Sequence, residues 1–296
     1  MSISDSQIVI LNSFDRSGSS AISRSLLLHP KIELLFQPFN GGSIRKKMNL
    51  VFSDQLVSDE DEYFFSELNQ GRLWREYIHS IWFDNYSSTK QIVPGKVNLI
   101  KTTLNHLTIN WIQNRFPKIA FWGIWRDPFD VLASLIRNDF YRKWFYGAER
   151  ELAETVVQNQ ECFAPEFVAL YALVENNPVR AMAYIIAVRS YFYFAYLKTD
   201  HVLNYQKFRQ NTDTELNKFT NTYFLEEFSW SNSAYADLNV TGATWSPGRN
   251  YRDQIPVQDM QYVRTVFRPL FRLMSERFGN SEWTSDKSSA GCQSND

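Results

Sequence analysis

The chain has 296 residues, of which 44% are hydrophobic, and its formal net charge is −1 at pH 7. This near-neutral balance excludes a global basic field for nucleic acid, and no apolar run approaches the ~18 residues of a membrane span. The first residues lack the pattern of a signal peptide, and the only cysteines are Cys162 and Cys292. We therefore expect a cytoplasmic protein with no nucleic-acid or membrane partner.

Short apolar runs alternate with helical patterns along the chain. The runs predict strands at Ile8–Leu11, Ile32–Phe36, Val97–Lys101, Ile119–Trp125 and Val202–Tyr205. Helical spacing is found in Ala21–Leu28, Tyr63–Tyr86, Leu104–Phe116, Pro128–Asn138, Pro165–Leu197 and Val257–Phe278. This alternation predicts an α/β fold, a three-layer sandwich with a central parallel sheet flanked by helices. We expect a single domain over residues 1–280, followed by a polar, disordered tail over 281–296.

The first strand leads into the sequence FDRSGSSAIS and then into a helix. A strand, a glycine turn and a helix N-terminus form an anion site, because backbone N–H groups and the helix dipole both favour negative charge. Gly18 permits a tight turn, and Arg16 adds a permanent cation. Neither the Walker A spacing nor the three-glycine Rossmann fingerprint is present. Taken alone, the stretch fits a phosphate cradle and a serine-capped turn equally well.

A second motif, RDPFDVLAS, follows the strand at Ile119–Trp125. Arg126 stands at the carboxyl end of that strand, where parallel sheets bind ligands, and Ser134 lies about two turns into the following helix. Together they are suited to gripping a second phosphate. The alternative is that Arg126 pairs with Asp127 or Asp130 and that Ser134 only packs.

The two motifs together resemble the sulfotransferases that use 3′-phosphoadenosine 5′-phosphosulfate (PAPS), in particular the bacterial and carbohydrate-type members. His29-Pro30 after the first helix and the stretch VLNYQKF are also similar to that family. The resemblance covers Ile8–Phe208 through short motifs. It implies a P-loop-NTPase-like sulfotransferase fold and transfer of the sulfuryl group to a hydroxyl or amine, with release of adenosine 3′,5′-bisphosphate and no metal.

The resemblance also implies roles for individual residues. Arg16 would lie beside the transferring sulfuryl group, and the 5′-phosphate cradle would be Ser17, Gly18, Ser19 and Ser20. The 3′-phosphate would be held by Arg126 and Ser134, with Tyr205 near the adenine. A closing C-terminal loop is matched by TWSPGRNYRD, in which Arg249 or Arg252 would reach the 3′-phosphate. Its spacing departs from the family's familiar cytosolic pattern.

The general base is where the sequence departs most from the family. Carbohydrate-type members often have Glu-Pro shortly after the first helix, where this chain has Gln37-Pro38. Cytosolic members often have a histidine where this chain has Thr103, and His106 follows three residues later. We rank His106 first and His79 second as the base, and each has an ordinary structural role as its alternative. Asp15, Glu76 and Asp84 are the carboxylate alternatives.

The acceptor side is expected in two aromatic-rich stretches, HSIWFDNY and NDFYRKWFYG. Candidate acceptor-binding residues are Gln37, Trp82, Tyr86, Tyr141 and Trp144, although aromatic residues at helical spacing usually belong to the core. The acceptor would be a small molecule, such as a natural product that the enzyme tailors or a glycan, and the protein a monomer or homodimer. A nucleotide kinase or P-loop ATPase, and a non-catalytic nucleotide-binding member of the fold, remain alternatives.

Overall fold

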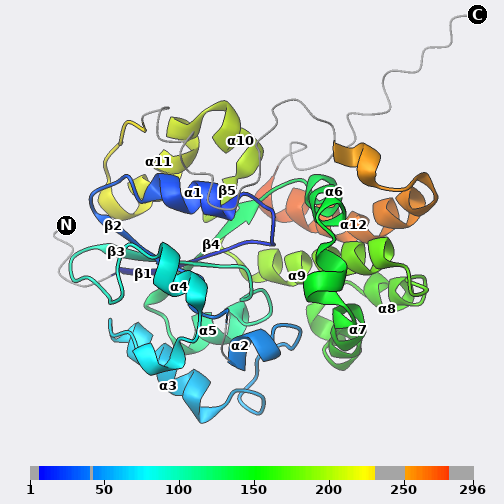
Figure 1. The fold of residues 1–296 in the computed structure, drawn as a ribbon, viewed down its shortest axis with the longest axis horizontal. Coiled ribbons are helices and arrows are strands. Elements are labelled where there is room, and N and C mark those ends of the chain that lie inside the picture. Colours follow the sequence, from blue (N-terminus) through cyan, green and yellow to red (C-terminus); the bar gives the residue numbers. More distant parts are fainter. Residues whose placement is uncertain (1–6, 41–42, 231–250, 280–296) are drawn as a thin grey trace, which may run out of the picture. The chain divides into compact units, whose positions relative to one another are not determined.

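The computed structural model describes residues 7–40, 43–230 and 251–279 (Figure 1). The chain divides into two compact units, one comprising residues 1–126 and 196–250 and the other residues 127–195 and 251–296. The single domain over 1–280 stays a prediction, and the predicted tail at 281–296 lies outside the described residues.

A five-stranded sheet, counted over the described residues, forms the centre of the first unit. All its strands pair in parallel in the order β2-β3-β1-β4-β5. They are β1 (Gln7–Asn12), β2 (Ile32–Phe36), β3 (Val97–Thr102), β4 (Ile119–Trp125) and β5 (Val202–Asn204). β1 lies in the middle of the sheet. After β1 the chain forms β2 and β3 on one side of it and then crosses to form β4 on the other side. The chain therefore changes direction at β1, which is where open parallel sheets bind ligands.

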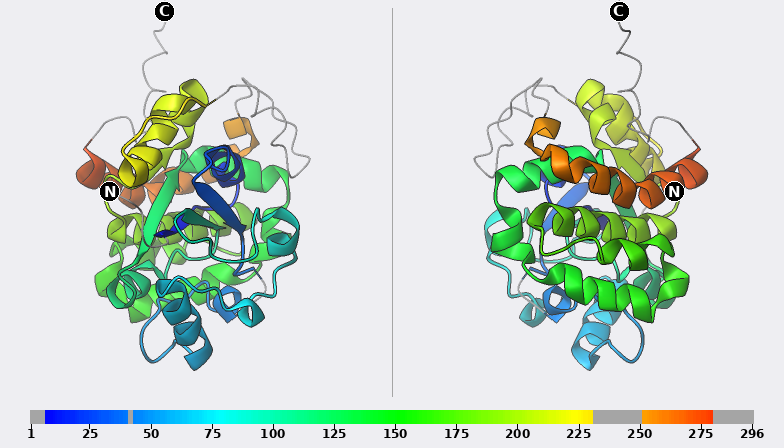
Figure 2. Two further views of the ribbon diagram at one scale, coloured as in Figure 1. Left: turned by 90° about the vertical axis from the view of Figure 1, so that its left-hand side faces the viewer. Right: turned by 90° about the vertical axis from the view of Figure 1, so that its right-hand side faces the viewer.

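Helices cover both faces of this sheet. Figures 1 and 2 show α1 (Ser19–Leu26), α10 (Tyr205–Gln210) and α11 (Thr212–Phe224) on one face, and α3 (Asp59–Asn69) and α5 (Ile109–Arg115) on the other. On the α1 face, Ile22 and Phe219 pack with strand residues such as Val9 in one buried cluster. The predicted α/β class, with a parallel sheet between helical layers, is confirmed.

The predicted long helix over Tyr63–Tyr86 is wrong. The chain forms α3, a short turn η1 (Arg75–Tyr77) and α4 (Ile81–Tyr86) instead. Gly71, with φ of 76°, ends the first helix, and the hydroxyl of Ser80 caps the N-terminus of α4 by accepting the N–H of Phe83. The short helix α2 (Ser43–Lys46) precedes α3.

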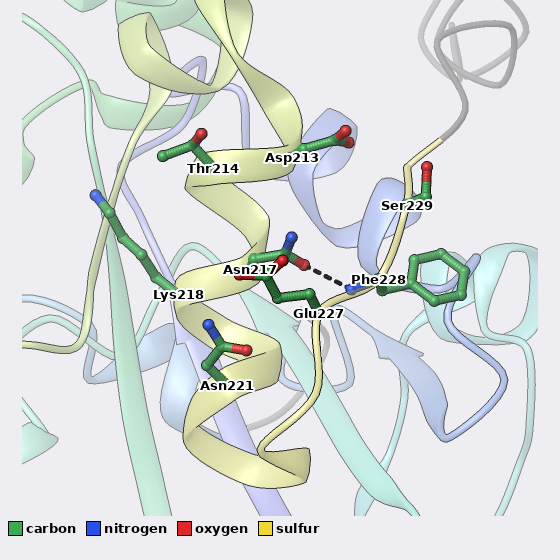
Figure 3. A pocket seen from close by; sticks show the side chains of 8 residues that line it. All are labelled: Asp213, Thr214, Asn217, Lys218, Asn221, Glu227, Phe228 and Ser229. Atoms are coloured by element: carbon green, nitrogen blue, oxygen red, sulfur yellow. Dashed lines mark hydrogen bonds between the residues drawn. The ribbon is translucent and has the colours of Figure 1, made fainter.

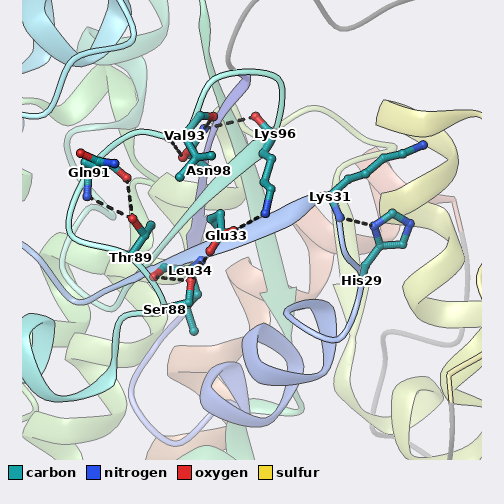
Figure 4. Close-up of polar contacts among 10 residues, drawn as sticks. All are labelled: His29, Lys31, Glu33, Leu34, Ser88, Thr89, Gln91, Val93, Lys96 and Asn98. Carbon is teal, nitrogen blue, oxygen red and sulfur yellow. Dashed lines mark hydrogen bonds and ion pairs between the residues drawn. The ribbon is translucent and has the colours of Figure 1, made fainter.

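The segment after α4 covers the edge strand β2. The Ser88 hydroxyl accepts the N–H of Leu34 at 2.7 Å and also contacts the carboxylate of Glu33, which pairs with Lys96 (Figure 4). The hydroxyl of the neighbouring Ser87 accepts the N–H of Phe36 at 2.8 Å. These contacts satisfy backbone groups that an edge strand would otherwise leave unpaired, and they fix α4 beside the end of β2.

The second unit is helical. In its described residues it contains α6 (Pro128–Arg137), η2 (Tyr141–Phe145), α7 (Ala148–Gln158), η3 (Gln160–Cys162), α8 (Glu166–Tyr171), most of α9 (Pro178–Tyr196), η5 (Tyr251–Gln254) and α12 (Val257–Phe278). Most of α9 is buried, and the ring of Phe129 in α6 contacts Phe267 in α12 at 5.2 Å between centroids. The bounds of α12 agree with the predicted helix.

Candidate functional site: the loop between β1 and α1

Residues 13–18 connect the carboxyl end of β1 to α1. The loop contains two residues in left-handed conformation, Arg16 with φ of 67° and Gly18 with φ of 88°. Its turn is closed by the N–H of Ser17, which donates to the carbonyl of Phe14 at 3.1 Å. Gly18 is the N-cap of α1 and supplies no side-chain cap, and the first turn holds no acidic residue. No acidic side chain of the first turn therefore competes for the N-terminal N–H groups of the helix, which favours anion binding there.

Two predicted nucleotide residues, Arg126 and Tyr205, contact this loop. A guanidinium N–H of Arg126 donates to the carbonyl of Arg16 at 2.6 Å, and the guanidinium carbon lies 5.0 Å from the centre of the Tyr205 ring. The same ring packs so closely on Gly18 that a Cβ at this position would lie 2.2 Å from its edge. Tyr205 is the first residue of α10 and not the end of a strand. The folded first unit therefore brings Arg16, Gly18, Arg126 and Tyr205 together from separate parts of the sequence.

Several polar atoms around the loop are buried without a partner. Both side-chain polar atoms of Asn12, the hydroxyl of Ser13 and Nε of Arg126 lack a hydrogen-bond partner. Asn12 is the last residue of β1 and pairs in register with Thr102 and Gly123. Buried polar groups are rarely left unpaired in a native protein, so these atoms mark the carboxyl end of β1 as a place for a polar ligand or water.

Sequence reasoning missed Lys101, which is buried near the end of β3 beside β1. Burial lowers the pKa of its ammonium to about 8, against an opposing effect of the Asp15 carboxylate. Its Nζ lies 4.7 Å from the centre of the Phe36 ring. A lysine inside a buried strand, directly after the apolar pair Leu99-Ile100 and one residue before the strand ends, was the signal that could have identified it.

The two histidine candidates for the base lie in different surroundings. His106 is 2% exposed, and its ring lies 5.6 Å from that of Phe14 in the loop. It follows a segment held by Asn105, which contacts the hydroxyls of Thr102 and Thr108 at 3.0 and 3.1 Å. His79 is exposed and lies between η1 and α4, not within a long helix. His106 is therefore beside the loop, whereas no contact among the described residues places His79 there.

Gln37 comes directly after β2 in a left-handed conformation with φ of 49°. Its N–H donates to the carbonyl of Lys101 at 2.7 Å, and its side-chain oxygen accepts from the amide of Asn40. The residue thus lies at the same edge of the sheet as Lys101, with its side chain engaged by its own turn.

Ser134 and Arg252 belong to the second unit. Ser134 is buried in α6, whose N-cap Asp127 accepts the N–H of Phe129 at 2.9 Å. Arg252 forms an ion pair with Asp127 and approaches Asp130 at 3.5 Å. Burial raises the pKa of Asp127, while Arg252 acts in the opposite direction. Arg249 lies outside the described residues.

The aromatic candidates are divided between the units. Trp82 and Tyr86 are on α4 of the first unit, with stacked rings 5.5 Å apart. Tyr141 and Trp144 are on η2 of the second unit, where the Tyr141 hydroxyl donates to Glu149 at 2.9 Å. Burial raises the pKa of Tyr141 to about 12, and the Glu149 carboxylate is the second largest cause of this rise. Trp144 is exposed.

A polar pocket of about 550 Å³ lies elsewhere in the first unit (Figure 3). It is lined by residues of α11 and of the segment that follows, namely Asp213, Thr214, Asn217, Lys218, Asn221, Glu227, Phe228 and Ser229. None of the residues predicted for the site lines it. The Asn217 side chain accepts the N–H of Phe228 at 3.1 Å, which fastens that segment to the helix.

Within the described residues, no group of His, Cys, Asp and Glu could hold a metal ion. No helix in that part of the chain is long and apolar enough to cross a membrane.

No family model matches the sequence, and no curated protein is significantly similar to it. Among solved structures, the chain is similar to a sulfotransferase from Alicyclobacillus acidocaldarius, with a TM-score of 0.45 and 12% identity over 93% of this chain and 97% of that one. A likeness of this degree does not support a functional assignment, so the proposal depends on this chain's own residues.

Proposed function

We propose that this chain is a PAPS-dependent sulfotransferase that transfers a sulfuryl group to a hydroxyl or amine of a small-molecule acceptor. The observation that carries the proposal is the meeting of Arg16, Gly18, Arg126 and Tyr205 at the carboxyl end of β1. They combine an anion-binding helix start, two arginines and an aromatic ring within one unit. That combination suits a nucleotide with more than one phosphate.

The residues present fit this ligand. Arg126 Nε and the Asn12 amide are buried without partners, and the absence of a side chain at Gly18 lets the Tyr205 ring pack against the loop. We assign Ser17, Gly18, Ser19 and Ser20 to the 5′-phosphate and Arg126 to the 3′-phosphate. Ser134 and Arg252, for which the resemblance implies contacts with the 3′-phosphate, belong to the second unit and are not part of this assignment.

In the proposed reaction, the acceptor oxygen or nitrogen forms a bond to sulfur while the bond between sulfur and the 5′-phosphate oxygen breaks. The electron pair stays on the departing adenosine 3′,5′-bisphosphate, so cations near that oxygen favour the transition state. Arg16 and Lys101 are our candidates for this role. The proton of the acceptor passes to a base, for which we rank His106 first because it lies beside the loop, with Asp15 as the carboxylate alternative.

A ligand-binding experiment tests the proposal. Adenosine 3′,5′-bisphosphate is expected to raise the Tm of the full chain more than ATP or GTP, because a ligand that binds only the native state stabilises it. Arg126→Ala should abolish most of that rise. Arg115→Ala is the matched control, because Arg115 is exposed and pairs with Glu62 away from the loop.

A larger Tm rise with ATP or GTP would contradict the proposal and favour a kinase or ATPase. Bisphosphate binding without any sulfuryl transfer from PAPS to a panel of phenols, amines and sugars would favour a non-catalytic nucleotide-binding protein. Retained activity in His106→Ala would remove His106 as the base.

A further inference from the structure

Arg24 is a half-buried arginine on α1, the helix that begins at the loop. It comes four residues after Ser20, so both side chains lie on the same face of the helix, one turn apart. Its Nε is buried without a hydrogen-bond partner, and the structure shows no ion pair for it among the residues it describes. Burial lowers its pKa, against an opposing effect of Tyr86, so the net effect of the surroundings is to disfavour the charge.

Two other half-buried arginines in the described residues pair with carboxylates. Arg180 donates to Asp259 at 2.9 Å and also pairs with Glu175, and Arg252 pairs with Asp127. An uncompensated, partly desolvated guanidinium is costly for a native fold. In the first unit the half-buried Arg126 likewise lacks a carboxylate among the described residues, and its proposed partner is a phosphate. The same reasoning indicates an anionic partner for Arg24.

One aromatic ring, that of Tyr86, lies near the Arg24 guanidinium, and further rings contact Tyr86 in turn. The guanidinium carbon lies 5.5 Å from the centre of the Tyr86 ring, which is stacked on Trp82. Trp82 is 38% exposed, and its ring is therefore accessible to a ligand. Tyr86 also contacts Phe36 at 5.6 Å, and Phe36 in turn contacts the Lys101 ammonium. A continuous series of rings thus connects Arg24 with the sheet edge where Lys101 lies.

The position of these rings separates them from the nucleotide residues. Phe36 ends β2, the edge strand, whereas Arg126 follows β4 on the other side of the central β1. The hydrogen bonds of Ser87 and Ser88 to β2 hold α4, and with it Tyr86 and Trp82, on the β2 side. A ligand there lies on the side of the loop away from Arg126.

We propose that Arg24, Tyr86 and Trp82 form a subsite for an aromatic acceptor that carries a carboxylate. This assignment rests on the proposed function and narrows its acceptor to aryl acids. The Arg24 guanidinium binds the carboxylate through its N–H donors, and the exposed ring of Trp82 stacks on the acceptor ring. The carboxylate of the acceptor supplies the negatively charged partner that the described residues do not provide for Arg24.

A pair of matched probes tests this subsite. Binding of 4-hydroxyphenylacetate and of 4-hydroxyphenylacetamide is measured by calorimetry on the full chain, with and without adenosine 3′,5′-bisphosphate. The probes share the ring and hydroxyl, and the charged carboxylate of the first is replaced in the second by a neutral carboxamide of similar shape. The amide is expected to bind at least about tenfold more weakly, because it cannot form charge-assisted hydrogen bonds with the guanidinium.

Three variants test whether Arg24 causes the difference in affinity between the acid and the amide. Arg24→Gln should remove the preference for the acid, and Arg24→Lys should restore part of it because the charge is kept without the planar fork. Arg72→Gln is the matched control, since Arg72 is exposed and pairs with Glu67. Circular dichroism at the measuring temperature confirms that each variant is folded.

The inference is overturned if the acid and the amide bind equally, if neither binds at millimolar concentration, or if folded Arg24→Gln keeps the preference. Failure of the proposed function gives a different result, the absence of bisphosphate binding. A preference for the acid that depends on Arg24 would persist in that case, so the two outcomes are distinguishable.

Discussion

Gly18 shows how a single residue type makes the candidate site possible. Its φ of 88° is a conformation that residues with a Cβ rarely adopt, and the Tyr205 ring occupies the space that a Cβ would need. The glycine therefore serves two purposes, a left-handed turn at the start of α1 and close contact with an aromatic ring that begins α10.

Gly18→Ala is expected to destabilise the protein by about 1–3 kcal/mol through backbone strain and the clash with Tyr205. Urea unfolding measures this loss. The double variant Gly18→Ala/Tyr205→Ala should be more stable than the simple sum of both changes predicts, because it removes the clash but keeps the strained φ. Strict additivity of the two changes would contradict the close contact.

Lys101 is a second single residue with a measurable effect, because its titration makes the free energy of unfolding depend on pH. Its pKa in the folded protein is about 8, below the value of 10.5 expected when unfolded, so the unfolded chain binds more protons between these pH values. The free energy of unfolding should therefore rise with pH in that window through this group, by at most about 1.4 kcal/mol per pH unit.

In Lys101→Met this contribution disappears. Subtracting the variant's pH profile of unfolding free energy from that of the parent isolates the contribution of Lys101, because the tyrosines and the other lysines titrate in both proteins. A difference profile that is flat between pH 8 and 10.5 would show that the lysine is not desolvated.

At the scale of elements, α3 is fixed by one buried carboxylate. Asp61 accepts from the Lys47 ammonium and the Ser58 hydroxyl, both at 2.7 Å, and from the hydroxyl of Tyr77. Ser58 is also the N-cap of the helix and forms a capping box with Asp61. One side chain thus connects α3 with the residues after α2 and with η1.

Asp61→Ala is expected to cost about 3–5 kcal/mol, because it leaves the Lys47 ammonium without its partner beside the core. Ser58→Ala should cost only about 1 kcal/mol, the usual loss of a helix cap. Thermal and urea unfolding of both variants give the comparison. Equal losses would mean that the capping contact, and not the buried ion pair, stabilises this region.

Some elements were predictable from sequence and others were not. The bounds of β2 and β4 agree with the predicted strands because each is a short and mostly apolar run, interrupted in β2 by the half-buried Glu33. The helix predicted from Leu104 begins only at Ile109, because the preceding residues form the Thr102–Asn105–Thr108 contacts. Apolar spacing alone did not reveal that Ser80 starts a new helix within Tyr63–Tyr86.

For the molecule as a whole, the sequence indicated the phosphate loop but not its surroundings. Arg16 and Arg126 were predictable because each follows a strand, and parallel strands end at one edge. Lys101 and Arg24 were not predicted as site residues. The interpretation of both depends on burial, and that of Arg24 also on the lack of an ion pair within the described residues, and these features arise only when distant segments pack. Contacts between residues far apart in the chain, such as Tyr205 on Gly18, have no local signal.

His29 connects distant parts of the first unit and gives a prediction for acid stability. It is 1% exposed and stacks on Phe224 at 4.5 Å. Its Nδ1 accepts the N–H of Lys31 at 3.2 Å, so Nε2 carries the proton and faces Glu226 at 3.2 Å. Burial lowers its pKa, although Glu226 opposes this effect and Lys31 adds to it. Through these contacts the neutral ring connects the residues that follow α1 with the end of α11 and the segment after it.

The unfolded chain binds a proton at His29 more readily than the folded one, so the free energy of unfolding should fall as pH drops below about 6.5. In His29→Gln this loss should be smaller than in the parent between pH 7.5 and 5, measured by urea unfolding. His201, whose pKa burial also lowers, accounts for part of the remaining loss, and His29→Gln/His201→Gln should therefore be less acid-sensitive still. Identical pH profiles for the parent and His29→Gln would show that His29 is protonated with equal ease in both states.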